Sequence, residues 1–207
     1  MKYFITGIDT NIGKTVATGF LANKFKAQGK TVITQKLIQT GCEGISEDIE
    51  AHRQAMGIPL QDVDLDGTTC NYVLKFPSSP HLACAMENVD VEVSSIAKNT
   101  EKLEALYDVV LLESAGGIMV PLKEDYLSLD YVLEYALPVI LVTSSRLGSI
   151  NHTLLNLELF KLKNIELAGL VYNKYPKEDS LIESSTQEYL KAYLSKHFPA
   201  AFFDSLS

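Results

Sequence analysis

The sequence predicts a three-layer α/β fold, in which a mostly parallel central sheet is flanked by helices. Short apolar runs rich in β-branched residues alternate with longer amphipathic runs, as they do in strand-helix-strand units. The short runs are almost continuously apolar, as in VVLL at 109–112 and VILV at 139–142. Such runs are typical of strands that are covered on both faces, which indicates a parallel sheet with helices on either side.

Five strands and five helices are expected along the chain. The strands are residues 3–6, 31–35, 108–112, 138–143 and 167–172. The helices, in which apolar residues recur at helical spacing, are 14–28, roughly 93–106, 128–135, 150–162 and 180–197. Pro59, Gly67, Pro77 and Pro80 interrupt any regular pattern between 58 and 80, so we expect a long loop there with a short strand at 72–76.

The composition narrows the class of protein. With 207 residues, 46% of them hydrophobic, the chain is long enough for one substantial core, and we expect residues 1–207 to form a single domain. The net charge of -8 and the absence of a Lys/Arg run disfavour nucleic acid and anionic membranes as partners. The start, MKYFITG, does not read as a signal peptide and no later run is long enough to span a membrane, so a cytoplasmic location is expected. Three cysteines without a C-x-x-C pair disfavour a zinc site or a disulfide framework.

Ligands of a parallel sheet bind at the carboxyl ends of its strands. Polar and glycine-rich segments follow all five predicted strands: GIDTNIGKT at 7–15, Lys36 with QTG at 39–41, ESAGG at 113–117, SSRLG at 144–148 and NKYP at 173–176. We therefore expect these segments to meet at one edge of the sheet and to form one site.

The segment GIDTNIGKT contains the groups that bind phosphate. Gly13, Lys14 and Thr15 supply a glycine turn, a lysine for the outer phosphates and a hydroxyl for magnesium, at the start of a predicted helix. The segment departs from the pattern G-x-x-x-x-G-K-[ST], because five residues separate Gly7 from Gly13 and Ile8 stands where the first glycine is expected. A plain strand-to-helix turn with a surface lysine is the alternative. The strand before, the helix after and the polar strand ends beside it favour a phosphate site in a P-loop NTPase-like fold.

Magnesium needs oxygen ligands in addition to Thr15, and two acidic residues are candidates. Glu113 follows four apolar strand residues, and the glycines at 116–117 keep the backbone clear beside it. Asp48 is the second candidate, although an acid at that point can also simply begin a helix.

Three further residues at the strand ends have candidate roles. Lys36 ends a strand beside the P-loop, where an ammonium group can meet the charge that develops on a transferred phosphoryl group. A solvated lysine at a strand end is its alternative. Thr40 is a candidate substrate-binding residue. Asn173 begins Asn-Lys-Tyr-Pro, which lacks the aspartate of the guanine-reading Asn-Lys-x-Asp, so adenine or loose base selection is the simpler interpretation.

These residues resemble those of the dethiobiotin synthetase family. GIDTNIGKT is similar to the family signature G-x-D-T-x-x-G-K-T, which carries the same extra residue. The similarity continues in the same order over about residues 2–203, through 36–41, Asp48, SPH at 79–81, ESAGG at 113–117, LGSINH at 147–152 and Asn173. It is specific because the unusual P-loop and the L-G-x-I-N-H segment occur together.

The resemblance implies a ligase of biotin biosynthesis that uses Mg²⁺ and ATP. Such an enzyme joins CO₂ to 7,8-diaminononanoate as a carbamate, phosphorylates the carbamate with ATP and closes the ureido ring of dethiobiotin. The resemblance also implies a homodimer, in which Leu147, Gly148 and Asn151 bind the carboxylate of the diamine across the interface. The start of a predicted helix at this point suits a carboxylate.

The family roles that the resemblance implies fall on named residues. Lys36 and Lys14 are catalytic, Thr15, Asp48 and Glu113 bind the metal, and Thr10 and Thr40 contact the substrate. The nucleotide contacts are Asn11, Ile12, Gly13, Lys14, Thr15, Val16, Asp48, Glu113, Ser114, Ala115, Gly116 and Asn173.

The chain departs from the family pattern at two places. Ser114 replaces the first glycine of the usual Glu-Gly-Ala-Gly-Gly. Family members also commonly continue, beyond the segment that corresponds to 199–207, through a Gly-x-Ile-Pro-like loop and a final helix around the base. We therefore expect weak ATP binding in the absence of the diamine. Calorimetry that finds tight, adenine-specific binding to the free protein would contradict this expectation.

Two other classes of P-loop protein are alternatives. An amidoligase of the cobyrinate type uses the same phosphoryl chemistry, but it usually carries a second, glutaminase domain, for which this chain has no room. A partner-regulated ATPase of the chromosome- or septum-positioning type usually has an extra lysine, as in G-K-G-G-x-G-K-T, where this chain has Ile8 and Asp9. ATP turnover that requires CO₂ and a diamine distinguishes the ligase from such a switch.

Overall fold

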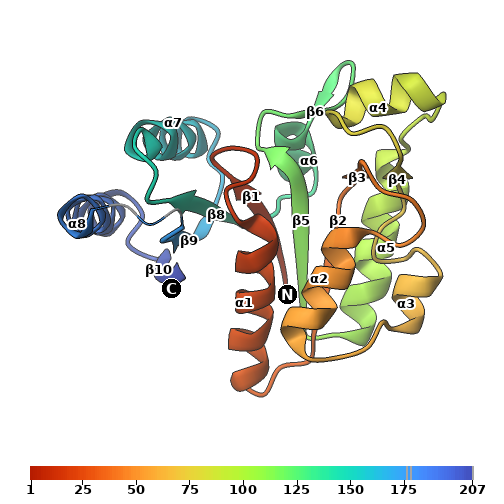
Figure 1. The fold of residues 1–207 in the computed structure, drawn as a ribbon, viewed down its shortest axis with the longest axis horizontal. Coiled ribbons are helices and arrows are strands. Elements are labelled where there is room, and N and C mark those ends of the chain that lie inside the picture. Colours follow the sequence, from red (N-terminus) through yellow and green to blue (C-terminus); the bar gives the residue numbers. More distant parts are fainter. Residues whose placement is uncertain (176, 178, 207) are drawn as a thin grey trace.

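The computed structural model describes residues 1–175, 177 and 179–206, and its centre is a parallel sheet (Figure 1). Pro176, which follows the predicted Asn-Lys-Tyr motif, lies outside the described residues. Within these residues the main sheet has six strands in the order β10-β9-β8-β1-β5-β2. They are β1 (Lys2–Gly7), β2 (Val32–Lys36), β5 (Val109–Gly117), β8 (Val139–Ser144), β9 (Leu167–Asn173) and β10 (Phe202–Leu206). All the neighbouring pairs are parallel, as the continuously apolar runs predicted.

Helices cover both faces of the sheet. They include α1 (Lys14–Ala27), α2 (Glu47–Met56), α5 (Val93–Leu106), α6 (Ser128–Glu134), α7 (Ser149–Leu162) and α8 (Ser180–His197). Neighbouring residues of β1 show the two layers, because side chains alternate along a strand. Phe4 packs in one buried cluster with residues of α5 to α8, whereas Ile5 packs in another with Leu21 of α1 and Met56 of α2. The predicted three-layer fold is confirmed.

Several short elements were not predicted, and most lie beside the sheet's carboxyl edge. They are β3 (Gln39–Thr40), α3 (Asp62–Leu65), α4 (Pro80–Glu87), β6 (Pro121–Lys123) and β7 (Tyr126–Leu127). The strand expected at 72–76 is present but shorter: it is β4 (Val73–Leu74), which pairs in parallel with β3. The loop expected over 58–80 was wrong in part, because the helix α3 forms within it.

The register of the sheet brings the polar strand ends together. Lys36 of β2 is the register partner of Glu113 of β5, and Gly7 of β1 is the partner of Gly117. The third strand was expected to end at residue 112, but β5 continues to Gly117, because the glycine-rich segment goes on pairing with β1. Lys36 and Glu113 therefore lie on adjacent strands at the same level, next to the end of β1.

Close packing and a buried ion pair hold α2 against the rest of the fold. Gly19 of α1 lies so near α2 that an added Cβ would be 2.6 Å from Cβ of Ala55. Arg53, which is 2% exposed, donates to both carboxylate oxygens of Asp64, at 2.8 and 2.7 Å, and to Oγ1 of Thr34 on β2, at 2.6 Å. Burial opposes the charge of Asp64, but the bonds from Arg53 outweigh it and lower the pKa of this carboxyl. The C-terminal half of α2 is thus held against α1 and β2.

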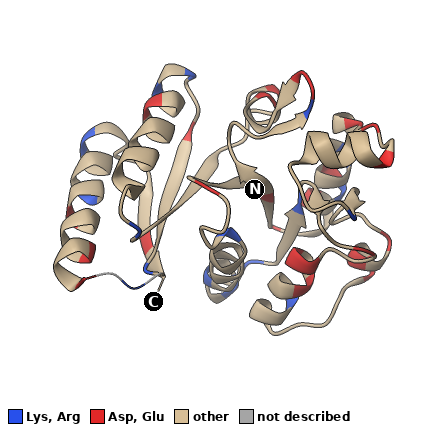
Figure 2. Cartoon of the chain, turned by 45° about the horizontal axis from the view of Figure 1, so that its top comes forward, with Lys and Arg blue, Asp and Glu red and all other residues tan. Residues whose placement is uncertain are grey.

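The described residues also show how charge is distributed and whether any helix is long and apolar. Lys and Arg are dispersed over many helices and loops (Figure 2). Among the described helices, none is both long enough and apolar enough to cross a membrane.

Candidate active site

The predicted phosphate-binding loop joins the central strand β1 to α1. Asn11 and Gly13 both have positive φ angles, 56° and 90°. At Gly13 a Cβ atom would lie 2.3 Å from Nδ2 of Asn173, so both the backbone conformation and the available space require glycine. The amide of Asn173 also donates to the carbonyl oxygen of Ile12 at 3.0 Å. The loop is therefore held between its own strand and the end of β9.

The N-terminus of α1 has no compensating side chain. Its N-cap is Gly13, no side chain caps it, and the first turn contains no acidic residue. The first N–H groups of a helix lack intrahelical partners and carry partial positive charge. This end of α1 is therefore suited to bind an anion such as a phosphate.

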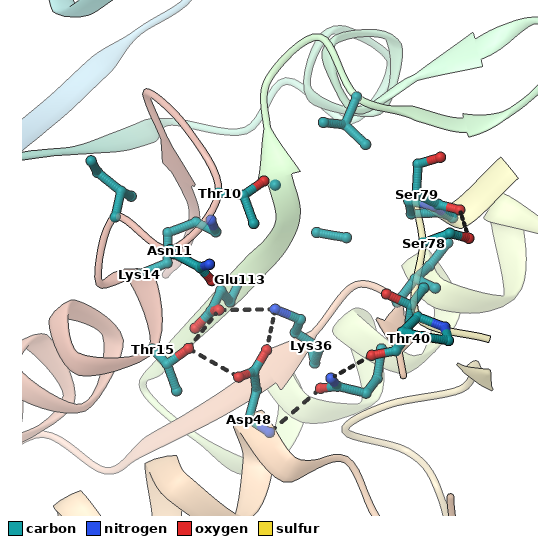
Figure 3. A pocket seen from close by; sticks show the side chains of 18 of the residues that line it. Thr10, Asn11, Lys14, Thr15, Lys36, Thr40, Asp48, Ser78, Ser79 and Glu113 are labelled. Atoms are coloured by element: carbon teal, nitrogen blue, oxygen red, sulfur yellow. Dashed lines mark hydrogen bonds and ion pairs between the residues drawn. The ribbon is translucent and has the colours of Figure 1, made fainter. Parts of the chain in front are cut away.

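A cavity of about 800 Å³ lies in front of this helix end (Figure 3). Its walls come from the P-loop, the segment from β2 to β3, the start of α4 and the end of β5. Of the predicted site residues, it is lined by Thr10, Asn11, Ile12, Gly13, Lys14, Thr15, Val16, Lys36, Thr40, Asp48, Glu113, Ala115 and Gly116. These residues, distant in sequence, thus surround one space.

Lys14 lies deep in the wall of this cavity. It is 7% exposed, and its Nζ donates to the carbonyl oxygen of Asp9 at 3.2 Å. Burial lowers the pKa of Lys14, and the charge of Lys36 lowers it further, against the attraction of Glu113. An anionic phosphate in the cavity would favour the charged form, so ligand and lysine are electrostatically complementary.

Four predicted residues form one hydrogen-bonded cluster at the base of the cavity (Figure 3). Oγ1 of Thr15 lies 3.0 Å from Oδ1 of Asp48 and 3.2 Å from Oε1 of Glu113. Nζ of Lys36 lies 2.9 Å from the same Oε1 and forms an ion pair with Asp48. It also donates to the carbonyl oxygen of Ser114 at 3.1 Å. An ammonium group thus lies between two carboxylates.

The surroundings of Glu113 keep it ionised. Burial opposes its charge, since the residue is 1% exposed, but the charge of Lys36 and a hydrogen bond from His52 hold the pKa of the carboxyl well below its usual range. Burial likewise opposes the charge of Lys36, and the negative charges of Glu113 and Asp48 outweigh it, so the pKa of Lys36 is raised. Both residues are therefore charged at neutral pH.

The donor set of this cluster suits Mg²⁺. Two carboxylates and a hydroxyl converge from α1, α2 and β5, and magnesium is usually bound by one or two carboxylates together with waters and phosphate oxygens. Among the described residues no group of three or more His, Cys, Asp or Glu side chains could enclose an ion by itself. The cluster is thus a partial set, of the kind that a nucleotide completes.

The far wall of the cavity is polar but weakly charged. Thr40 on β3 lies opposite Thr10 of the P-loop, with Ser78 and Ser79 beside it (Figure 3). Ser79 is the N-cap of α4, and Pro80 occupies the first turn of that helix. This wall offers hydroxyl groups to a ligand that reaches across from the phosphate side.

The remaining predicted site residues do not line the cavity as the described residues define it. Ser114 is fully buried behind it and donates to the carbonyl oxygen of Gly116 at 2.8 Å. Asn173 supports the back of the P-loop, and its Oδ1 accepts a hydrogen bond from the backbone of Tyr175. Leu147, which is 84% exposed, Gly148 and Asn151 lie at the start of α7. These three residues therefore lie outside the cavity, and the side chain of Leu147 is open to solvent.

Sequence reasoning gave no site role to several residues that the structure brings to this region. Gln39, Ser78 and Val120 line the cavity, and His52 contacts Glu113 from behind. The motif Ser-Pro-His at 79–81 was the one signal for the serine wall. His52 had none, because 61 residues separate it from its partner.

Comparisons with known proteins agree with these motifs. The chain is 53% identical over 200 residues to the ATP-dependent dethiobiotin synthetase BioD 2 of Haemophilus ducreyi, covering 97% of this chain and 95% of the relative. It is 50% identical to the protein of the same name from Pasteurella multocida, covering 98% and 95%. The chain belongs to the dethiobiotin synthetase family. The family model described as an AAA domain matches residues 1–199.

Solved structures of low sequence identity share the fold of this member of the dethiobiotin synthetase family. The pNOB8 ParA structure is 15% identical, with a TM-score of 0.57 over 99% of this chain and 87% of that chain. A putative plasmid partition protein from Borrelia burgdorferi bound to AMPPNP is also 15% identical, with a TM-score of 0.56 over 100% and 86%. This likeness confirms the P-loop NTPase-like fold and indicates nothing more specific.

Proposed function

We propose that this chain catalyses the ATP-dependent conversion of 7,8-diaminononanoate and CO₂ to dethiobiotin, as a single cytoplasmic domain of biotin biosynthesis. The observation that carries the proposal is the cluster of Thr15, Asp48, Glu113 and Lys36 beneath an uncapped helix N-terminus. Relatives that are at least half identical and bear the name dethiobiotin synthetase support this reaction over the ATPase switch.

The nucleotide phosphates would bind at the start of α1. Backbone N–H groups of residues 11–16 and the ammonium of Lys14 bind the phosphates of ATP, with Ala115 and Gly116 as a further wall. Thr15, Asp48 and Glu113 would hold Mg²⁺, which neutralises phosphate charge when it is bound. Ser114 acts indirectly in this arrangement, by fixing the turn at Gly116.

The chemistry needs two balanced steps after the carbamate forms. One amine of the diamine adds to CO₂ and loses a proton; a carbamate oxygen then attacks the γ-phosphorus of ATP, and ADP leaves. The second amine attacks the carbamoyl carbon and loses a proton, the C–O bond to phosphate breaks, and the ring closes with release of inorganic phosphate. Lys36 lies beside the metal cluster, where its charge stabilises the negative charge that grows on the transferred group.

The diamine would occupy the polar side of the cavity. Thr10 and Thr40 bind its reacting end, near Lys36. Leu147, Gly148 and Asn151 would bind the carboxylate of a diamine in the partner subunit of a homodimer, because in one chain they lie outside the cavity and Leu147 is exposed. Asn173 would contribute to nucleotide binding mainly by holding Ile12.

Phosphate release by the purified protein tests this function. ATP, Mg²⁺ and bicarbonate are supplied with and without 7,8-diaminononanoate, and product mass is followed in the same sample. We expect release that depends on the diamine and a product with the mass of dethiobiotin. Release that ignores the diamine would contradict the ligase and favour the ATPase switch.

A further inference from the structure

One face of α2 carries one of the two acidic candidate metal ligands, Asp48, and contacts the other, Glu113. Asp48 and His52 are four residues apart, so they lie one above the other on the same side of the helix. Asp48 reaches Thr15 and Lys36, whereas Nε2 of His52 lies 2.8 Å from Oε2 of Glu113. A single helix therefore supplies one carboxylate of the cluster and a contact to the other.

The two oxygens of Glu113 have different partners. Oε1 accepts from Lys36 and Thr15, both of which line the cavity. Oε2 accepts from Oγ1 of Thr18 at 2.9 Å and faces His52, and neither of these side chains lines it. The pair behind the carboxylate fixes the plane in which Oε1 is presented to the cavity. Donors of this kind set the orientation and the strength of a carboxylate ligand.

A histidine at this position is costly for packing alone. His52 is completely buried, and within the described chain its Nδ1 has no hydrogen-bond partner. A buried polar atom without a partner destabilises the fold, and an apolar side chain of similar size would avoid this cost. The contact with Glu113 is the feature of this site that an apolar residue cannot provide.

We propose that His52 is a positioning residue of the metal site. Its Nε2–H donates to Oε2 of Glu113 and, together with Thr18, keeps Oε1 turned toward Thr15 and Lys36. The inference rests on the proposed function, because it assumes that Glu113 binds the magnesium of a magnesium-nucleotide complex. The residue touches neither substrate nor metal, and it acts through the carboxylate.

Three variants of the full-length protein test this role. His52→Leu removes the donor at similar volume, and His52→Gln places its amide nitrogen close to the position of Nε2. His52→Asn places its amide nitrogen closer to the position of Nδ1, so it cannot replace the bond. Met56→Ala, on the same helix and without contact to Glu113, is the control for a general loosening of α2, because Met56 is buried.

The first readout is the affinity for Mn²⁺ in the presence of ADP, from the loss of the free-ion signal in electron paramagnetic resonance. The second is the Mg²⁺ concentration that half-saturates product formation. We expect His52→Leu and His52→Asn to lower the Mn²⁺ affinity, and to raise the half-saturating Mg²⁺ concentration, by roughly 10- to 100-fold, which is the range for residues that orient metal ligands. His52→Gln recovers most of the affinity. Met56→Ala lowers the unfolding temperature but leaves metal affinity at the wild-type value.

Two results overturn the inference while leaving the proposed function intact. One is wild-type metal affinity in His52→Leu. The other is an equal loss in His52→Gln and His52→Asn, both folded, and this pair carries the test alone if the leucine variant does not fold. Wild-type protein that fails to bind Mn²⁺ with ADP would instead refute the metal site of the proposed function, and the inference with it.

Discussion

Among the helices that begin at the candidate active site, α1 and α2 have N-termini that are built in opposite ways. α1 starts at Gly13 without a side-chain cap or an acidic first turn. α2 starts at Ser46, whose hydroxyl accepts from the backbone of Ile49, and three acidic residues lie in its first turn. The positive end of α1 is thus left for an external anion, whereas α2 satisfies its own end and directs one acid, Asp48, into the cavity. In the proposed function, this difference separates phosphate binding at α1 from metal binding at α2.

Lys36 contacts Asp48 of α2 and Glu113 of β5, and we expect its loss to have the largest effect. In Lys36→Ala we expect the rate of product formation to fall by roughly 10²–10³-fold, because in the proposed function its ammonium group stabilises the transferred phosphoryl group. Single-turnover product formation at saturating ATP is the measurement. Lys30→Ala, at an exposed position, is the matched control. A rate within twofold of wild type would remove Lys36 from the reaction.

The acidic first turn of α2 offers a sharper test, because of two neighbouring acidic side chains one lines the cavity and the other is exposed to solvent. Asp48 contacts Thr15 and Lys36, while Glu47 is exposed. Asp48→Asn should raise the half-saturating Mg²⁺ concentration at least about tenfold, and Glu47→Gln should leave it unchanged. Titration of activity with Mg²⁺ measures both. Equal changes in the half-saturating Mg²⁺ concentration would mean that Asp48 has no special role in binding the metal.

The uncapped end of α1 depends on glycine. Gly13→Ala forces a side chain into a left-handed conformation and against Asn173, so we expect a loss of about 1–3 kcal/mol of folding stability together with weaker ATP binding. Gly57 at the end of α2 also has positive φ but open space around it, so Gly57→Ala should cost about 1–2 kcal/mol and leave ATP binding intact. Urea unfolding and ATP calorimetry check the pair. Unchanged ATP binding in Gly13→Ala would show that the loop tolerates a side chain.

The smallest expected effect is the pH dependence of ATP binding. Burial and Lys36 lower the pKa of Lys14 in the free protein, so raising the pH discharges this lysine earlier than an ordinary one. If the pH is raised from 7.5 to 9.5, we expect the Kd of the wild type for ATP to rise by about threefold. Lys14→Arg stays charged and should have a flatter profile. Calorimetry at the two pH values decides, and parallel profiles would contradict this role of Lys14.

The sequence was sufficient to predict five of the six strands of the main sheet and most of the cavity, for physical reasons. Continuous apolar runs such as 109–112 exclude most alternatives to a buried parallel strand. Gly13, Lys14 and Thr15 are adjacent in sequence, so their joint position follows from one turn. Glu113 and Lys36 lie at strand ends, and the parallel order alone brings them to one edge.

Other parts depend on tertiary contacts that no local pattern encodes. α2 was missed because its buried face contains His52 and Arg53, which look like a solvated surface until Glu113 and Asp64 are known to face them. The extension of β5 to Gly117 depends on pairing with Gly7. The strand β10 follows a helix and pairs only at the sheet edge, next to β9.

The fate of oxygen from CO₂ tests most directly whether this site phosphorylates a carbamate. The protein is given freshly added ¹⁸O-labelled CO₂ with ATP, Mg²⁺ and 7,8-diaminononanoate. The reaction is stopped before the oxygens of CO₂ exchange with water, and the inorganic phosphate is analysed by mass spectrometry. A carbamate oxygen that attacks the γ-phosphorus leaves with phosphate, so we predict one ¹⁸O atom in each phosphate released and one in the ureido carbonyl. Phosphate without label would mean that water attacks ATP, and it would contradict the ligase mechanism.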